Sequence, residues 1–160
     1  MFLANAARAT ALLLAAAALG CAQPSVNSTG AVGAPVRTEQ LIIDTASGAV
    51  RLNVEIADDE QERNRGLMFR ETLADDAGML FDFPIPEHAS FWMRNTILSL
   101  DIIFVGTDGR ILNIADHTTP YSDDPIPAVG LTRGVLELRA GRAEALGIRP
   151  GDRVRHRIFP

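Results

Sequence analysis

Short segments in which apolar and polar residues alternate dominate the chain from about residue 40 onward. Between Val50 and Ile56 every second residue is aliphatic, and the residues between them are polar or charged, which is the period of a strand with one buried face. Asp108-Gly109 separates two further apolar segments, and this pair favours a tight hairpin because both residues tolerate positive φ angles. A succession of such segments predicts a β-rich fold.

The rest of this region adds further strands and two short helices. Further strands are expected at residues 41–43, 79–81, 90–93, 100–105, 111–114, 135–139 and 153–158. One helix should follow Asp59, which can form a capping box with Glu62, and end at Gly66; a second is expected at residues 140–146. We predict one α+β domain over residues 40–160, mostly β and barrel- or sandwich-like, with two short helices.

The first 21 residues have the composition of an export signal. Arg8 is the only charge in the first 36 residues, and an apolar run from Ala9 to Leu19 follows it. The run is shorter than the roughly 20 residues that span a bilayer and has the size of a signal-peptide core. It ends in Ala18-Leu19-Gly20-Cys21, which resembles a bacterial lipobox. We expect a signal peptide over residues 1–21 and lipidation of Cys21; the alternative is cleavage after Ala22 and secretion.

Residues 22–39 are rich in Pro, Ser, Asn and Gly and show no hydrophobic periodicity. This composition is typical of a flexible tether, and such a tether would let a domain stand off from a membrane. We therefore expect the protein on the periplasmic side of the cell envelope. The outer membrane is favoured because Ala22 follows the cysteine, where aspartate would resemble an inner-membrane retention signal.

The composition excludes several classes of chemistry. A single cysteine excludes intramolecular disulfides and zinc sites built from several thiolates. All 15 basic side chains are arginine, so no residue can form a Schiff base or act as a phosphate-loop lysine. The three histidines are scattered, and the net charge of -5 argues against a nucleic-acid partner. We expect neither a metal nor a cofactor.

Several short motifs occur in a familiar order along residues 50 to 155. They are Gly66-Leu67-Met68, Gly78-Met79-Leu80-Phe81, Phe91 to Thr96, Leu100-Asp101, Asp108 to Ile111, Val135 to Leu138 with Ala140-Gly141, Leu146 to Ile148, and Gly151-Asp152. Together they resemble an uncharacterised bacterial and archaeal family called domain of unknown function 192. Ser99 departs from the family, which usually has proline there. The resemblance implies a compact β-barrel-like domain, often exported, and supplies no activity, so function must be argued from the site.

The segment from Phe91 to Thr96 offers the first candidate site. If it begins as a strand, Trp92 and Arg94 share one face and could bind a planar or sugar-like ligand, with the guanidinium facing an anionic group. Asn95 and Thr96 would add hydrogen bonds. The structural alternative is that Trp92 is a packing anchor, that Arg94 pairs with a carboxylate, and that Asn95 and Thr96 stabilise a turn.

Asp101 is the second candidate, because it lies in a strand that is apolar on both faces and is therefore expected to be buried. It could be a general acid or base with a raised pKa. Alternatively, it could be a structural acceptor for Arg94, for the Trp92 indole or for loop N–H groups. Glu137 alternates with leucines and is expected to face away from the core; nothing in the spacing supports a catalytic pair of Asp101 and Glu137.

These observations favour a non-catalytic, envelope-anchored or exported domain with a binding or accessory role. Its expected ligand-binding residues are Trp92, Arg94, Asn95, Thr96 and Asp101, and its partners are the membrane, through Cys21, and a small ligand or another envelope component. Two alternatives remain. One is an enzyme that uses Asp101, such as a hydrolase of envelope glycans, and the other is a structural accessory protein without a pocket.

Overall fold

The structure is a computed structural model, and it describes residues 37–160. It contains nine strands and two short helices. In chain order these elements are β1 (Thr38–Thr45), β2 (Gly48–Ala57), α1 (Glu60–Arg65), β3 (Ala77–Glu87), β4 (Ser90–Phe91), β5 (Leu100–Gly106), β6 (Ile111–Ala115), β7 (Ile126–Pro127), β8 (Thr132–Arg139), α2 (Arg142–Ala145) and β9 (Arg153–Arg155). The expected mostly β domain with two short helices is confirmed.

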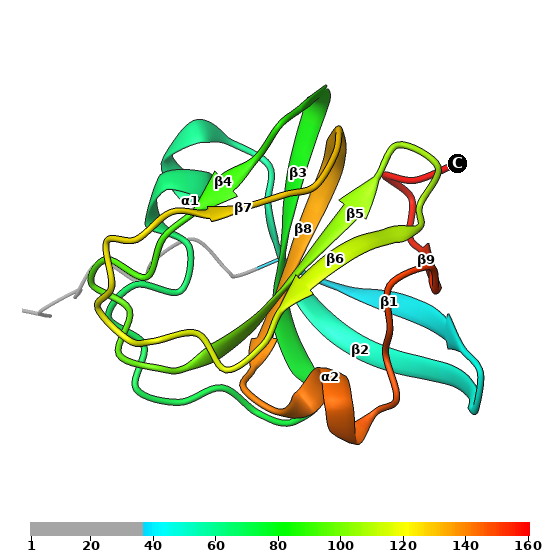
Figure 1. Ribbon diagram of the computed structural model, residues 1–160, viewed down its shortest axis with the longest axis horizontal. Coiled ribbons are helices and arrows are strands. Elements are labelled where there is room, and N and C mark those ends of the chain that lie inside the picture. The colour runs from blue at the N-terminus through cyan, green and yellow to red at the C-terminus, as the bar shows by residue number, and fades with distance from the viewer. Residues whose placement is uncertain (1–36) are drawn as a thin grey trace, which may run out of the picture. The chain divides into compact units, whose positions relative to one another are not determined.

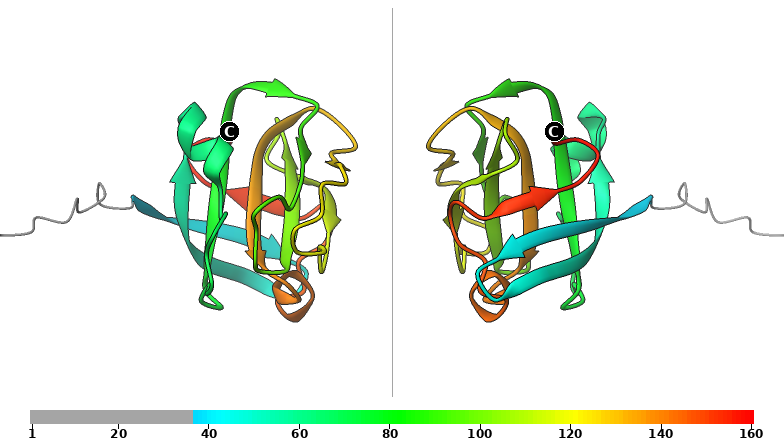
Figure 2. Two further views of the ribbon diagram at one scale, coloured as in Figure 1. Left: turned by 90° about the vertical axis from the view of Figure 1, so that its left-hand side faces the viewer. Right: turned by 90° about the vertical axis from the view of Figure 1, so that its right-hand side faces the viewer.

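Seven of the strands form one sheet in the order β6-β5-β8-β3-β2-β1-β9, while β4 and β7 form a separate pair. All neighbours in the large sheet are antiparallel except β2 and β3. The sheet curls into a half-barrel (Figure 1). Its β9 end approaches the start of β6, where Arg110 and Arg153 form an isolated bridge. Figure 2 shows β9, in red, running beside β1.

Both faces of the central strands are covered, so two apolar cores form. One core fills the inside of the curled sheet and includes Leu80, Ile103 and Leu136. The other lies on the opposite face and includes Phe81 and Phe104. Because side chains alternate along a strand, consecutive residues of β3, β5 and β8 enter different cores. Figure 1 shows α1, β4 and β7 over the face that carries the second core.

Local signals in the sequence set the ends of α1 and of the β5–β6 hairpin. The Asp59 side chain accepts a hydrogen bond from the Glu62 backbone N–H at 2.7 Å, and the Glu62 side chain completes the capping box. Gly66 ends the helix with a φ of 48°, and Gly109 has a φ of 77° in the hairpin, where a positive φ favours glycine.

Several expected strand boundaries differ from the structure. The strand expected at residues 79–81 is the much longer β3 (Ala77–Glu87), and three other differences follow from contacts with distant segments. β1 begins at Thr38, two residues before the expected start of the domain, because Thr38 pairs with Glu55 on β2. The strand expected at residues 90–93 ends at Phe91, since its partner β7 has only two residues. The strand expected at residues 153–158 stops at Arg155, and Ile158 and Phe159 pack into the inner core instead.

Candidate functional site

Glu137 is buried on the central strand β8, at the floor of the second core. It lies opposite Met79 on β3 and Ile102 on β5, and only 5% of the residue is exposed. The prediction that Glu137 faces away from the core is wrong, because β8 is covered on both faces. Its Oε2 is buried without a hydrogen-bond partner within the described part of the chain. Burial raises the pKa of this carboxyl to about 8, because a low-dielectric environment disfavours the charged form.

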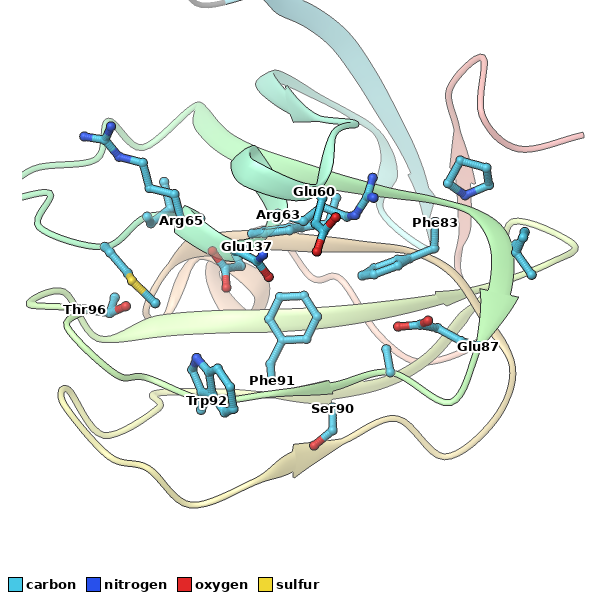
Figure 3. Close-up of a pocket in the computed structure, with 18 residues that line it drawn as sticks. Glu60, Arg63, Arg65, Phe83, Glu87, Ser90, Phe91, Trp92, Thr96 and Glu137 are labelled. Carbon is cyan, nitrogen blue, oxygen red and sulfur yellow. The ribbon is translucent and has the colours of Figure 1, made fainter.

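A cavity of about 580 Å³ lies above Glu137. It is bounded by α1 and the loop that follows it, by the second half of β3, and by the segment from Ala89 through Trp92. Figure 3 shows Glu137 at the back of this space, with Phe91 in front of it and Phe83 to one side. The volume falls within the range of roughly 300–1,000 Å³ that is usual for small-molecule sites.

Aromatic rings form much of the cavity wall. The ring of Phe91 meets Phe81 edge to face, with centroids 5.0 Å apart, and meets Phe83 at 6.4 Å. The ring of Phe91 also meets Phe104 edge to face, with centroids 5.9 Å apart. Edge-to-face packing of this kind is favourable and fixes the rings in place, so the wall is formed before any ligand arrives.

Gly66 lets the end of α1 close over the floor of the cavity. A Cβ at this position would lie 3.1 Å from Cζ of Phe81 and 4.0 Å from Oε2 of Glu137. The glycine that ends the helix therefore also brings the backbone close to the buried carboxyl. This contact explains part of the desolvation of Glu137.

Charged side chains of both signs line the cavity: Glu60, Glu87, Arg63 and Arg65. Arg63 is already engaged, because its guanidinium donates to the carbonyl oxygens of Asp58 at 2.7 Å and Asp82 at 3.1 Å. It also lies 5.9 Å from the centroid of the Phe83 ring. The two glutamates and the two arginines therefore cancel in net charge. The guanidinium of Arg63 is held in place by two backbone carbonyl groups.

The residues expected from the segment Phe91 to Thr96 divide between the cavity and the surface. Trp92 and Thr96 line the cavity, whereas Arg94 lies outside it and pairs with Asp123 at 2.7 Å. The Arg94 guanidinium also lies 4.7 Å from the centroid of the Trp92 ring. Trp92 and Arg94 therefore lie together, but not on one face of a strand as expected, because β4 ends at Phe91. Arg94 pairs with a carboxylate, as the structural alternative held.

Asn95 and Thr96 organise the loop around this segment. Asn95 adopts a left-handed φ of 56°, and its carbonyl accepts the N–H of Phe69 at 2.9 Å. The carbonyl of Thr96 accepts the N–H of Tyr121 at 3.2 Å. These backbone bonds join three loops at one side of the cavity, so the two residues shape the site through the backbone.

Asp101 is fully buried, as expected, but it does not line the cavity. Its Oδ1 accepts the backbone N–H groups of His117 at 3.0 Å and Gly141 at 3.1 Å, and its Oδ2 accepts that of Ala143 at 2.8 Å. Of the structural partners considered from the sequence, only loop N–H groups are present, those of His117 and Gly141, and they are joined by the N–H of Ala143 in the first turn of α2. Of the five residues expected to bind a ligand, only Trp92 and Thr96 therefore line the cavity.

Neither a metal cluster nor a membrane-spanning helix is found in residues 37–160. No group of three or more His, Cys, Asp or Glu in this region could hold a metal ion. No helix there is long and apolar enough to cross a membrane. Cys21 and the expected signal peptide lie outside the described residues.

Glu137 is the residue that sequence reasoning placed incorrectly, although a signal for it was present. It lies in an otherwise apolar strand between Leu136 and Leu138. That strand pairs with β3 and β5 in the middle of the sheet. Neither face of this central strand is open to solvent, so a carboxylate on it is buried whichever way it points. The alternation alone suggested an exposed face, because it does not show how many layers cover a sheet.

Comparisons with known proteins agree with the motifs. A family model described as "Uncharacterized ACR" (domain of unknown function 192) matches residues 42–156. No curated protein is significantly similar to the chain.

Two solved structures are similar over almost their whole length. A Sinorhizobium meliloti 1021 protein, provisionally named a transcription regulator, is 39% identical with a TM-score of 0.76, and the match covers 79% of this chain and 99% of that one. A protein of unknown function from Novosphingobium aromaticivorans DSM 12444 is 42% identical with a TM-score of 0.75, covering 85% and 94%. Both relatives consist almost entirely of this fold, so the fold exists as a chain of its own. The chain therefore belongs to the family of domain of unknown function 192.

Proposed function

We propose that this chain is an exported, lipid-anchored binding domain, and that the cavity above Glu137 holds a small ligand. The observation that carries the proposal is the buried, unpartnered Oε2 of Glu137 at the floor of a cavity of about 580 Å³. An unsatisfied buried polar atom costs on the order of 1–3 kcal/mol. A ligand that supplies the missing partner recovers this cost.

The contacts of Asp101 favour binding over hydrolysis. The hydrolase alternative uses Asp101 as an acid or base, but both of its oxygens are held by backbone N–H groups and the residue is fully buried. Glycoside hydrolysis uses two carboxyl groups that flank the scissile bond. Asp101 cannot reach a substrate in the cavity above Glu137, because it does not line that cavity.

The envelope location rests on the sequence. The apolar run that ends at Cys21, and the Pro-, Ser- and Gly-rich segment after it, support a lipid anchor followed by a tether. Replacing Cys21 with serine removes the thiol that carries the acyl chains. We expect the Cys21→Ser chain to leave the membrane fraction, and an unchanged distribution between membrane and soluble fractions would contradict the anchor.

The binding function is tested by native mass spectrometry of residues 22–160 purified from a periplasm. We expect a mass above that of the chain alone, which disappears when the protein unfolds. A Glu137→Met variant should lose this mass, because it removes the polar group at the floor. Glu144→Gln, which removes a carboxylate from exposed α2, should keep it. A wild-type chain that carries no additional mass would favour the accessory role without a ligand.

A further inference from the structure

Resting on the proposed function, we infer that the cavity selects an uncharged ligand, with a flat apolar body held among Phe83, Phe91 and Trp92 and a hydrogen-bond acceptor, such as a carbonyl oxygen, directed at Glu137. In this arrangement the Glu137 carboxyl donates the hydrogen bond. Three features of the cavity support this ligand class: its floor, its walls and its charged lining.

The floor presents a neutral carboxyl group. Oε2 of Glu137 is buried and has no partner among residues 37–160, and its neighbours across the sheet are Met79 and Ile102. The raised pKa, about 8, keeps the group protonated at pH 7. A protonated carboxyl has an O–H to donate. The partner it needs is therefore an acceptor, and a ligand carboxylate would place a negative charge in the same desolvated space.

The walls fit a flat apolar body. Phe81 is buried beneath the cavity, whereas Phe83 and Phe91 are half-buried and Trp92 is 51% exposed. These partly exposed rings have surface still available to a ligand. Aromatic rings pack well against other flat groups, so this wall favours a ring or a conjugated system over a branched or strongly hydrated one.

The charged lining gives no net preference for a charged ligand. Glu60 and Glu87 are balanced by Arg63 and Arg65. An ammonium ligand would have to ionise Glu137 to form an ion pair, and it would share the Phe83 wall with the guanidinium of Arg63. Both requirements weaken the binding of cations relative to a neutral molecule of the same shape.

Three probes of nearly the same shape separate the ligand classes: benzamide, benzylammonium and benzoate. Trp92 is the only tryptophan in the chain and lines the cavity, so its fluorescence reports binding directly. For molecules of this size a Kd on the order of 1 mM is expected. Titrations at pH 6.5 with residues 22–160 should show benzamide binding at least about tenfold more tightly than either ion.

Variants of Glu137 then test whether this residue makes the hydrogen bond to the ligand. Glu137→Gln keeps a donor and should bind benzamide with a similar Kd, whereas Glu137→Met should weaken it about tenfold. Glu144→Gln is the matched control and should leave all three titrations unchanged. Thermal melts of each variant confirm that the cavity is folded.

The outcomes distinguish this inference from the function on which it rests. Benzylammonium or benzoate binding as tightly as benzamide would overturn the neutral class and leave the binding function intact. If the folded Glu137→Met variant binds benzamide with the same Kd as the wild type, Glu137 does not bind the ligand. The proposed binding function would again remain intact. A fluorescence signal that none of the three probes changes would overturn the flat, uncharged ligand class, and the additional mass in native mass spectrometry would then decide the binding function separately.

Discussion

Replacing Glu137 with glutamine should remove a pH dependence from the stability of the domain. The pKa of the Glu137 carboxyl is about 8 in the folded protein and 4.5 as its ordinary value. Between these values the folded state holds a proton that the unfolded state has released. Stability is therefore fully present below about pH 4.5 and falls as the pH rises towards about 8.

The size of the effect follows from the difference between the two pKa values. Each unit of difference corresponds to about 1.4 kcal/mol, so the full loss approaches about 5 kcal/mol once the carboxyl is ionised in both states. Between pH 5 and pH 7 the expected loss is roughly 2–3 kcal/mol. Glutamine has nearly the same shape and does not titrate, so the variant lacks this loss.

Urea unfolding of the two proteins at several pH values between 5 and 8 measures the difference. Other titrating groups, such as Glu39, whose pKa is lowered chiefly by its hydrogen bond with Arg157, contribute equally to both proteins and cancel. We expect the Glu137→Gln chain to gain stability relative to the wild type by roughly 3–4 kcal/mol from pH 5 to pH 8. A difference in unfolding free energy that stays constant across this range would refute a buried, neutral Glu137.

Two other substitutions test the parts of the structure that hold the site. Asp101→Asn should lower the free energy of unfolding by about 3 kcal/mol and the Tm by about 10 °C. The amide nitrogen is a donor, and it would face the Ala143 N–H, which now donates to Oδ2. An unchanged melting curve would contradict the structural role of this carboxylate. Gly78→Ala should destabilise by about 1–3 kcal/mol, because its Cβ would lie 2.6 Å from the carbonyl oxygen of Glu137 and 2.7 Å from Cδ2 of Leu138. Chemical denaturation measures both, and a more stable Gly78→Ala chain would disprove the close approach of these strands.

Much of the fold could be predicted because local signals determine it. The alternation from Val50 to Ile56 is the middle of β2, and the Asp108-Gly109 turn joins β5 to β6. The capping box of Asp59 and the C-cap at Gly66 both form as expected. These features depend on residues close together in the chain, so their physical causes are visible in the sequence.

The candidate site depended on contacts between distant segments, and the sequence predicted it only in part. Trp92 and Arg94 lie together as predicted, but the strand alternation on which that prediction rested is absent, because β4 ends at Phe91. The sequence could not show that the following loop meets Phe69 and Tyr121 through the backbone. Periodicity likewise predicted the burial of Asp101 but not its N–H partners, because His117, Gly141 and Ala143 are 16 to 42 residues away.

The clearest error concerned Glu137, and its cause is physical. Alternation in one strand identifies two faces, and the usual inference is that the polar face meets solvent. In this domain α1 and the β4–β7 pair cover that face. The covering layer comes from α1 and β4, which begin 77 and 47 residues before Glu137, and from the loops around β7. Only the folding of these segments against β3, β5 and β8 buries the carboxyl.

A neutral Glu137 carboxyl that donates a hydrogen bond to a ligand in the cavity can be observed by carbon-13 NMR. The chemical shift of this side-chain carboxyl would be titrated with pH in the free domain and with saturating benzamide. We expect a pKa of about 8 in the free protein and a further rise of about one unit with benzamide, because a ligand that binds the protonated form tenfold more tightly stabilises it. A free pKa near 4.5, or a pKa that benzamide leaves unchanged, would contradict this expectation.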